Sequence, residues 1–182
     1  FPDKLRPYQQ QAVLETVRNF RTGRHTLNAS EVGLGKTRMA GSFSQTISSF
    51  NKVLWITSKT LVPQTVRELS SLGCTVIPTG ENASIYLQLK LPSNTIFITH
   101  YEVLKRDSSL HSASWDCIII DEVSKLKGGA SGRPTQIYRD IEHFLHVEQP
   151  QAFRYFLSGT PAENRPEEVW AYLHLFDPDR FD

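Results

Sequence analysis

SEVGLGKT, residues 30–37, is the most informative stretch of this 182-residue chain. A phosphate-binding loop has the pattern of a glycine, four arbitrary residues, then Gly-Lys and Ser or Thr. Gly35, Lys36 and Thr37 supply the end of that pattern, but Ser30 stands where the first glycine is expected. The stretch therefore indicates either an ATP site with one altered residue or a glycine-rich turn between a strand and a helix.

Apolar runs that are typical of strands alternate with helical patterns on both sides of this stretch. Strands are expected at residues 25–29, 52–57, 74–78, 95–99, 115–121 and 153–158. Helices are expected from residue 36 and at 61–69, 85–89, 101–106, 134–145 and 166–176. The first helix is predicted by a stripe that follows Pro7 and consists of Tyr8, Val13, Leu14, Val17 and Phe20.

The strand-like run CIII, residues 117–120, is apolar at every position and does not alternate with polar residues. Such a run is typical of a parallel strand that is covered on both faces. Together with the alternation of strands and helices, it predicts one α/β domain, residues 1–182. We expect a doubly wound, mostly parallel sheet with helices on both faces.

Composition bounds the possible partners. The net charge of +1 does not predict nucleic-acid binding, and no apolar run approaches the roughly 18 residues of a membrane span, so no membrane partner is expected. The two cysteines, Cys74 and Cys117, make neither a disulfide framework nor a metal cluster. Both lie in apolar strand-like runs, which favours buried thiols and a reducing compartment.

The loop follows a strand and begins a helix, where ligands bind in parallel α/β sheets. Its backbone N–H groups and the positive end of the helix dipole suit phosphate, Lys36 would reach the β- and γ-phosphates, and the Thr37 hydroxyl would ligate Mg²⁺. The residues of this loop expected to contact ATP are Gly33, Leu34, Gly35, Lys36, Thr37 and Arg38.

A second stretch, CIIIDEVSK, ends an apolar strand in two adjacent carboxylates, Asp121 and Glu122. Mg²⁺ prefers oxygen ligands and keeps several waters, so Asp121 fits the role of its protein holder. Glu122, one residue on, would orient or deprotonate the attacking water. An isolated pair of acids could equally mark a helix N-terminus, but downstream of GLGKT the pair is the expected partner of the loop.

These and further stretches, in order, resemble the helicase superfamily two, and within it the Swi/Snf-type translocases related to chromatin remodellers. ASEVGLGKT resembles that branch's ADEMGLGKT, which itself lacks the first glycine. VLWITSKTLVPQTVREL, FITHYEVLKRD and DEVSKLKG resemble its APxSLVxQW, ITTYExLRRD and DEAHRLKN segments. LRPYQ resembles the segment before its first strand, and YFLSGTPAENRPEEVWAYLHLFDPDRF resembles LTGTPIQNNLEELWxLLxFLDPxxF.

The resemblance implies a RecA-like P-loop NTPase lobe that binds ATP and Mg²⁺. It places Gln9 against adenine, and Lys59, Thr60, Thr99 and Tyr101 near a nucleic-acid strand, with DNA, and duplex DNA in this branch, as the expected partner. It assigns the coupling of the two sites to Ser124, Ser158, Gly159 and Thr160.

The chain also departs from the family pattern. Ser30 replaces an aspartate, Thr57 and Ser58 replace the Ala-Pro of the APxSLVxQW segment, and Ser124 replaces the histidine that usually couples the two sites. Asn28 puts an amide in a strand position that is typically apolar, where it is expected to need a neighbouring polar partner.

A motor of this family has two such lobes, and the second carries arginine fingers in a QxxGRxxRxGQ stretch that no segment here resembles. The chain is therefore expected to be lobe one, nearly inactive without lobe two of the same parent. Two alternatives remain open: another superfamily-two motor, either an unwinding helicase or a restriction-type translocase, and a catalytically weak scaffold lobe that binds nucleic acid.

Overall fold

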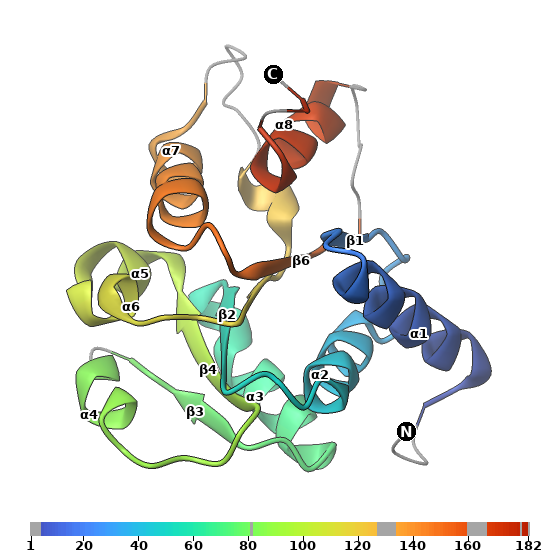
Figure 1. The fold of residues 1–182 in the computed structure, drawn as a ribbon, viewed down its shortest axis with the longest axis horizontal. Coiled ribbons are helices and arrows are strands. Elements are labelled where there is room, and N and C mark those ends of the chain that lie inside the picture. Colours follow the sequence, from blue (N-terminus) through green and yellow to red (C-terminus); the bar gives the residue numbers. More distant parts are fainter. Residues whose placement is uncertain (1–4, 81, 127–133, 160–166, 179, 182) are drawn as a thin grey trace.

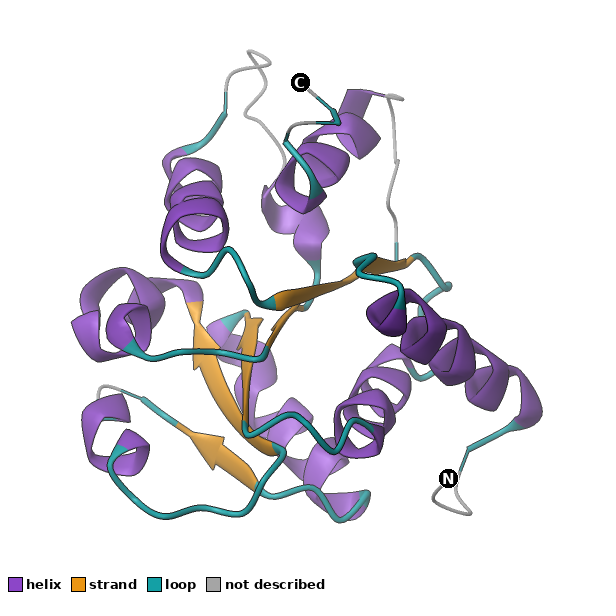
Figure 2. Cartoon of the chain, in the orientation of Figure 1, coloured by secondary structure: helices purple, strands orange, loops and turns teal. Residues whose placement is uncertain are grey.

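The computed structural model describes residues 5–80, 82–126, 134–159, 167–178 and 180–181. These residues form one sheet of parallel strands in the order β1-β6-β5-β2-β4-β3 (Figures 1 and 2). The strands are β1 (Thr26–Asn28), β2 (Lys52–Thr57), β3 (Val76–Pro78), β4 (Thr95–His100), β5 (Cys117–Ile120) and β6 (Phe153–Leu157). The predicted doubly wound sheet is confirmed, and every strand pair in it is parallel.

Helices cover both faces of the sheet, each over a separate apolar core. One core lies under α1 (Pro7–Arg21), α2 (Lys36–Thr46) and α3 (Val62–Ser71). The other lies under α4 (Ala83–Leu87), α5 (Tyr101–Arg106), α6 (Ser108–Ser112), α7 (Gln136–His143) and α8 (Glu167–Phe176). The short helical turns are η1 (Lys59–Leu61), η2 (Val123–Leu126) and the π-turn η3 (Phe144–Glu148).

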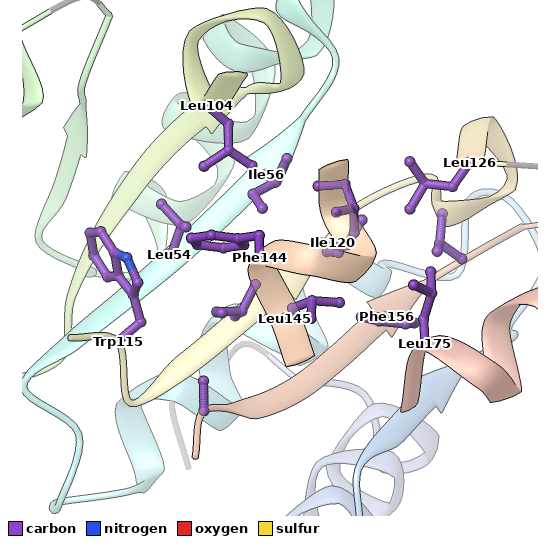
Figure 3. Packing of buried hydrophobic residues seen from close by; sticks show 14 of the residues in the cluster. Leu54, Ile56, Leu104, Trp115, Ile120, Leu126, Phe144, Leu145, Phe156 and Leu175 are labelled. Carbon is purple, nitrogen blue, oxygen red and sulfur yellow. The ribbon is translucent and has the colours of Figure 1, made fainter. Parts of the chain in front are cut away.

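The side chains of each central strand divide between these two cores. In β2, Val53 and Trp55 point to the α1–α3 side, whereas Leu54 and Ile56 point to the α4–α8 side (Figure 3). All four are fully buried. Because successive side chains of a strand alternate in direction, a strand covered on both faces needs apolar residues at every position.

The first helix corrects the predicted stripe. Tyr8 and Leu14 are 41% and 52% exposed, and the inward positions include Gln9 and Thr16 instead. Both polar side chains have a local partner, since the Thr16 hydroxyl donates to the Ala12 carbonyl and Gln9 Oε1 caps the helix start. Helical apolar periodicity therefore located the helix but misjudged part of its buried face.

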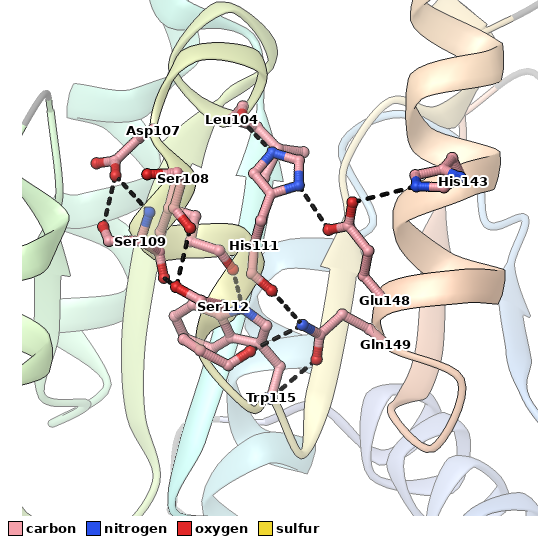
Figure 4. A network of polar contacts seen from close by, with 12 residues as sticks. Leu104, Asp107, Ser108, Ser109, His111, Ser112, Trp115, His143, Glu148 and Gln149 are labelled. Atoms are coloured by element: carbon pink, nitrogen blue, oxygen red, sulfur yellow. Dashed lines mark hydrogen bonds and ion pairs between the residues drawn. The ribbon is translucent and has the colours of Figure 1, made fainter.

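Helix α6 was not predicted, and polar contacts rather than an apolar stripe hold it (Figure 4). Asp107 accepts a hydrogen bond from the Ser109 N–H at its start. The His111 ring lies between the Glu148 carboxylate and the Leu104 carbonyl. The Gln149 side chain donates to two backbone carbonyls and accepts from one N–H of the segment that leads into β5, which ties this segment to η3.

Three further predictions concern single features. Cys74 and Cys117 are buried free thiols, as expected. Asn28 finds its polar partner, because its Oδ1 accepts a hydrogen bond from the Ser30 N–H at 3.1 Å. Within the described part of the chain, no helix combines the length and apolarity needed to cross a membrane.

Candidate nucleotide-binding site

The loop between β1 and α2 shows why a serine is tolerated at its first position. Gly33 and Gly35 have φ angles of +87° and +79°, the left-handed region that favours glycine. Ser30 does not lie in that region, so no glycine is needed there. Position 30 contributes its backbone: its N–H donates to Asn28 Oδ1, and its carbonyl accepts from Lys36.

Lys36, the first residue of α2, folds back over the loop. Its Nζ donates to the carbonyls of Ser30 at 2.8 Å and Glu31 at 3.0 Å. Burial lowers the pKa of this ammonium, while the nearby carboxylates of Asp121 and Glu122 act to raise it. The cation is thus held at the helix N-terminus, facing the acidic end of β5.

Helix α1 clamps the loop from the other side. Gln9 Nε2 donates to the Leu34 carbonyl at 2.9 Å, and the Tyr8 hydroxyl donates to the same carbonyl at 3.2 Å. Gln9 Oε1 accepts from the Arg6 N–H. The Gln9 amide, expected against adenine, therefore also supports the shape of the phosphate-binding loop.

This clamp makes the two loop glycines unequal. A Cβ at Gly35 would lie 2.5 Å from Gln9 Nε2, whereas one at Gly33 would meet nothing within 4 Å. We expect Gly33→Ala to cost about 1 kcal/mol of stability from the left-handed φ alone. Gly35→Ala should cost about 2 to 3 kcal/mol, because it also breaks the Gln9–Leu34 bond. Urea unfolding of both variants measures the difference, and equal losses would contradict the clamp.

The two carboxylates lie just beyond β5. Asp121 is 9% exposed, and its pKa is raised to about 6, first by burial and then by the charge of Glu122. The Thr57 hydroxyl donates to Asp121 Oδ2 at 3.4 Å. Glu122 has a φ of +53°, which is uncommon for a residue with a side chain, and strained backbone of this kind clusters at functional sites.

One pocket of about 300 Å³ brings these groups together. It is lined by Gly33, Gly35, Lys36 and Thr37 of the loop, by Asp121 and Glu122, and by Gly159 after β6. Leu34 and Arg38 do not line it; the Leu34 carbonyl is bound by Gln9, and Arg38 pairs with Glu68 at 3.7 Å.

Helix α3 also lines this pocket, which the sequence did not reveal. Leu61, the last residue of η1, and Gln64, Thr65 and Glu68 of α3 line it opposite the phosphate-binding loop. The segment that contains them resembles the family's APxSLVxQW segment, which contacts the nucleic-acid backbone, so a place at the nucleotide pocket was not expected. The helical spacing of Thr65 and Glu68 places both on one face of α3, but the direction in which that face points depends on how α3 packs against α2.

Gly159 connects the end of β6 to the loop. A Cβ at this position would lie 2.7 Å from Val32 Cγ2 and 3.5 Å from Lys36 Nζ. The preceding Ser158 is fully buried, and its N–H donates to the Asn28 carbonyl at 3.0 Å. Of the other predicted coupling residues, Thr160 lies outside the described residues, and Ser124 is described only through its backbone in η2.

The residues expected near nucleic acid divide into two groups. Lys59 and Thr60 are exposed in η1, directly after β2. Tyr101 begins α5 after the neighbouring strand β4, but its hydroxyl donates inward to the Asp121 carbonyl at 3.4 Å. Thr99 is 1% exposed, so its side chain does not reach the surface, unlike those of Lys59 and Thr60.

The donor set fits Mg²⁺ better than a metal that needs many protein ligands. Among the described residues, no group of three or more His, Cys, Asp or Glu side chains is placed to hold a metal. Mg²⁺ usually takes one or two carboxylates and keeps water. Burial and, after it, the charge of Glu122 raise the pKa of Asp121, and a divalent cation at this end of β5 would relieve both costs.

Comparisons with known proteins match nearly the whole chain. The model of the family described as type III restriction enzyme, res subunit, matches residues 3–163. The ISWI chromatin-remodeling complex ATPase ISW1 of Saccharomyces cerevisiae is 30% identical over 98% of this chain and 16% of its own length. The chain thus spans a small part of that relative.

Two solved structures share the fold. The Sulfolobus solfataricus SWI2/SNF2 ATPase core in complex with dsDNA superposes with a TM-score of 0.78 and 25% identity, over 98% of this chain and 36% of that one. A nuclease-deletion mutant of the type ISP restriction-modification enzyme LlaGI, in complex with a DNA substrate mimic, matches 89% of this chain and 18% of its own with a TM-score of 0.63. At 19% identity, the second likeness concerns the fold alone.

Proposed function

This chain belongs to the family described as type III restriction enzyme, res subunit, as a Swi/Snf-type RecA-like lobe of superfamily two, and from that premise we propose that it binds ATP with Mg²⁺. We further propose that the protein containing it hydrolyses ATP to move along duplex DNA. The observation that carries the proposal is the pocket in which Lys36, Asp121, Glu122 and Gly159 meet.

Phosphate binding falls to the loop and the start of α2. The N-terminus of a helix offers unpaired N–H groups and a positive dipole end, which suit an anion. Lys36 would exchange the carbonyls of Ser30 and Glu31 for phosphate oxygens. Because those carbonyls hold the ammonium at the pocket in advance, little reorganisation is needed when nucleotide enters.

Thr37 and Asp121 would hold Mg²⁺, which when bound neutralises charge on the phosphate oxygens. Glu122 accepts a proton from the attacking water while the water oxygen bonds to the γ-phosphorus and the bond to the β-phosphate oxygen breaks. The strained φ of Glu122 supports this role, since it directs an acidic side chain into the pocket at an energetic cost.

DNA would lie along the surface of Lys59 and Thr60, which donate to phosphates without reading sequence. Ser158, Gly159 and Thr160 would transmit the state of the nucleotide site, and Gly159 lies so near the loop that an added Cβ would meet the side chains of Val32 and Lys36. We propose that residues 1–182 form lobe one and that a second lobe supplies the arginine fingers needed for rapid turnover.

The test is ATP turnover by the full-length protein with no DNA, with single-stranded DNA and with duplex DNA. We expect duplex to raise turnover by at least about tenfold, because DNA contacts that favour lobe closure assemble the catalytic site. The Lys59→Ala variant should need more duplex for the same stimulation, as one phosphate contact is lost. Turnover that is indifferent to DNA would contradict the nucleic-acid assignment and leave the nucleotide site standing.

The matching family also favours a second candidate, a restriction-type translocase. It shares the ATP chemistry and differs in its biological task, so residues of the pocket do not separate the two. A strand-displacement assay with the full-length protein separates both translocases from an unwinding helicase, which alone would release the displaced strand.

A further inference from the structure

Strand register places Thr57 beside the carboxylate that would hold the metal. Parallel β2 and β5 pair Trp55 with Ile119 and Ile56 with Ile120. The Asp121 N–H donates to the Ile56 carbonyl at 2.9 Å, which extends the ladder by one step. Thr57 and Asp121 therefore lie across from each other at the carboxyl ends of neighbouring strands.

Alternation along the strands sets the direction of both side chains. Trp55 and Ile119 belong to the core under α1–α3, and the residues two positions on point to the same side. That is the side on which α2 begins with Lys36. The two side chains thus meet at the floor of the pocket rather than on opposite faces of the sheet.

The Thr57 hydroxyl is committed to this carboxylate. Thr57 is fully buried, and its Oγ1 donates to Asp121 Oδ2 at 3.4 Å. A buried hydroxyl without a partner is costly, and Asp121 Oδ2 is the partner that the described residues offer it. A donor on one oxygen favours one rotation of the carboxylate, which retains further lone pairs for a cation.

A second contact steadies the backbone of the same residue. The Tyr101 hydroxyl donates to the Asp121 carbonyl at 3.4 Å from the start of α5. The carbonyl and the side chain of Asp121 are therefore held from α5 and β2, respectively. The APxSLVxQW segment that this part of the chain resembles has alanine at the position of Thr57, so this chain differs from that segment by a side-chain donor.

We infer that Thr57 is a positioning residue that orients the Asp121 carboxylate for the divalent cation accompanying the nucleotide. The inference rests on the proposed function and adds to it the means by which the carboxylate is aimed. Thr57 does not touch nucleotide; it acts through Asp121. Its loss should weaken the part of nucleotide binding that depends on Mg²⁺ and leave the rest unchanged.

The experiment measures binding of a non-hydrolysable ATP analogue to the full-length protein, in EDTA and across a Mg²⁺ titration. Thr57→Val removes the hydroxyl and keeps the shape of the side chain, whereas Thr57→Ser keeps the hydroxyl. We expect the gain in affinity on adding Mg²⁺ to be about tenfold smaller in Thr57→Val than in the wild type, because one hydrogen bond to a charged group is lost. Thr57→Ser should retain the gain, and all three proteins should bind equally in EDTA.

The outcomes separate this inference from the function on which it rests. A full Mg²⁺-dependent gain in Thr57→Val would overturn it, and so would a Thr57→Ser variant as weak as Thr57→Val. A loss of affinity by Thr57→Val that is equally large in EDTA would show a packing defect and also overturn it. Failure of the wild-type protein to bind the analogue at all would instead refute the proposed ATP site.

Discussion

Replacing Glu122 by glutamine is expected to lower ATP turnover of the full-length protein by about 10²- to 10⁴-fold, the usual contribution of a general base. Glutamine keeps the size of the side chain and loses the ability to accept the proton of the attacking water. Glu122 lines the pocket beside Asp121 and Lys36. Single-turnover hydrolysis measures the chemical step without interference from product release.

Two comparisons make the Glu122 result specific. Nucleotide affinity of Glu122→Gln should stay within about threefold of the wild type, because phosphate binding rests on the loop and Lys36. The same substitution at Glu15, an exposed residue of α1, should leave turnover unchanged. Normal single-turnover hydrolysis by Glu122→Gln would show that another group activates the water.

Replacing Asp121 by asparagine is expected to stabilise the metal-free protein at pH 7 while it abolishes the effect of Mg²⁺ on nucleotide binding. The pKa of Asp121 is raised from 3.8 to about 6 by burial and by the charge of Glu122. A shift of that size corresponds to about 3 kcal/mol of destabilisation when the group is ionised. Asparagine keeps the shape and carries no charge.

The sign of the pH dependence follows from the raised pKa. Between pH 4 and pH 6 the native state binds more protons at Asp121 than the unfolded state, so stability falls as the pH rises through this window. The advantage of Asp121→Asn should therefore be largest above pH 6 and vanish near pH 4. Urea unfolding in EDTA at both pH values measures it.

Asp116, at the other end of β5, provides the matched control. Its Oδ2 accepts hydrogen bonds from the N–H groups of Asn51 and Lys52 at 2.7 and 2.9 Å. Asp116→Asn weakens these charge-assisted bonds and should destabilise the protein by about 1 kcal/mol. The same change from aspartate to asparagine at the two ends of β5 would thus have opposite effects on the stability of the protein. If Asp121→Asn is also destabilising at pH 7, its carboxylate is not a cost to the fold.

Much of the fold was predictable from local sequence. All six strands begin and end within two residues of the predicted ranges, including β5, which begins at Cys117 and stops at Ile120, one residue before Asp121. Uninterrupted apolar runs of four to six residues fit a strand buried on both faces and little else of that length. The phosphate-binding loop was equally recognisable, because its conformation depends on glycines within the same short segment.

Elements held by polar contacts were harder to predict. Helix α6 lacks an apolar stripe and depends on the contacts of His111 with Glu148 and of Gln149 with the His111 carbonyl, which join segments 37 and 38 residues apart. Gln9 lies on the buried face of α1 because its side chain supports the phosphate-binding loop, and that loop lies 25 residues further along the chain. Propensity and periodicity contain no information about such partners.

The residues of SEVGLGKT and CIIIDE are sufficient to specify a loop with two left-handed glycines, a lysine at a helix N-terminus and two acids after a buried strand. Their meeting in one pocket, the turn of α3 toward it and the contact of Thr57 with Asp121 depend on the strand order β1-β6-β5-β2-β4-β3. That order sets β5 beside β2, so that Thr57 meets Asp121, which lies 64 residues later in the chain. A slip of one residue in the register of these two strands would turn Thr57 away from Asp121. Register is settled by packing both cores at once, and a local stretch of sequence does not contain that information.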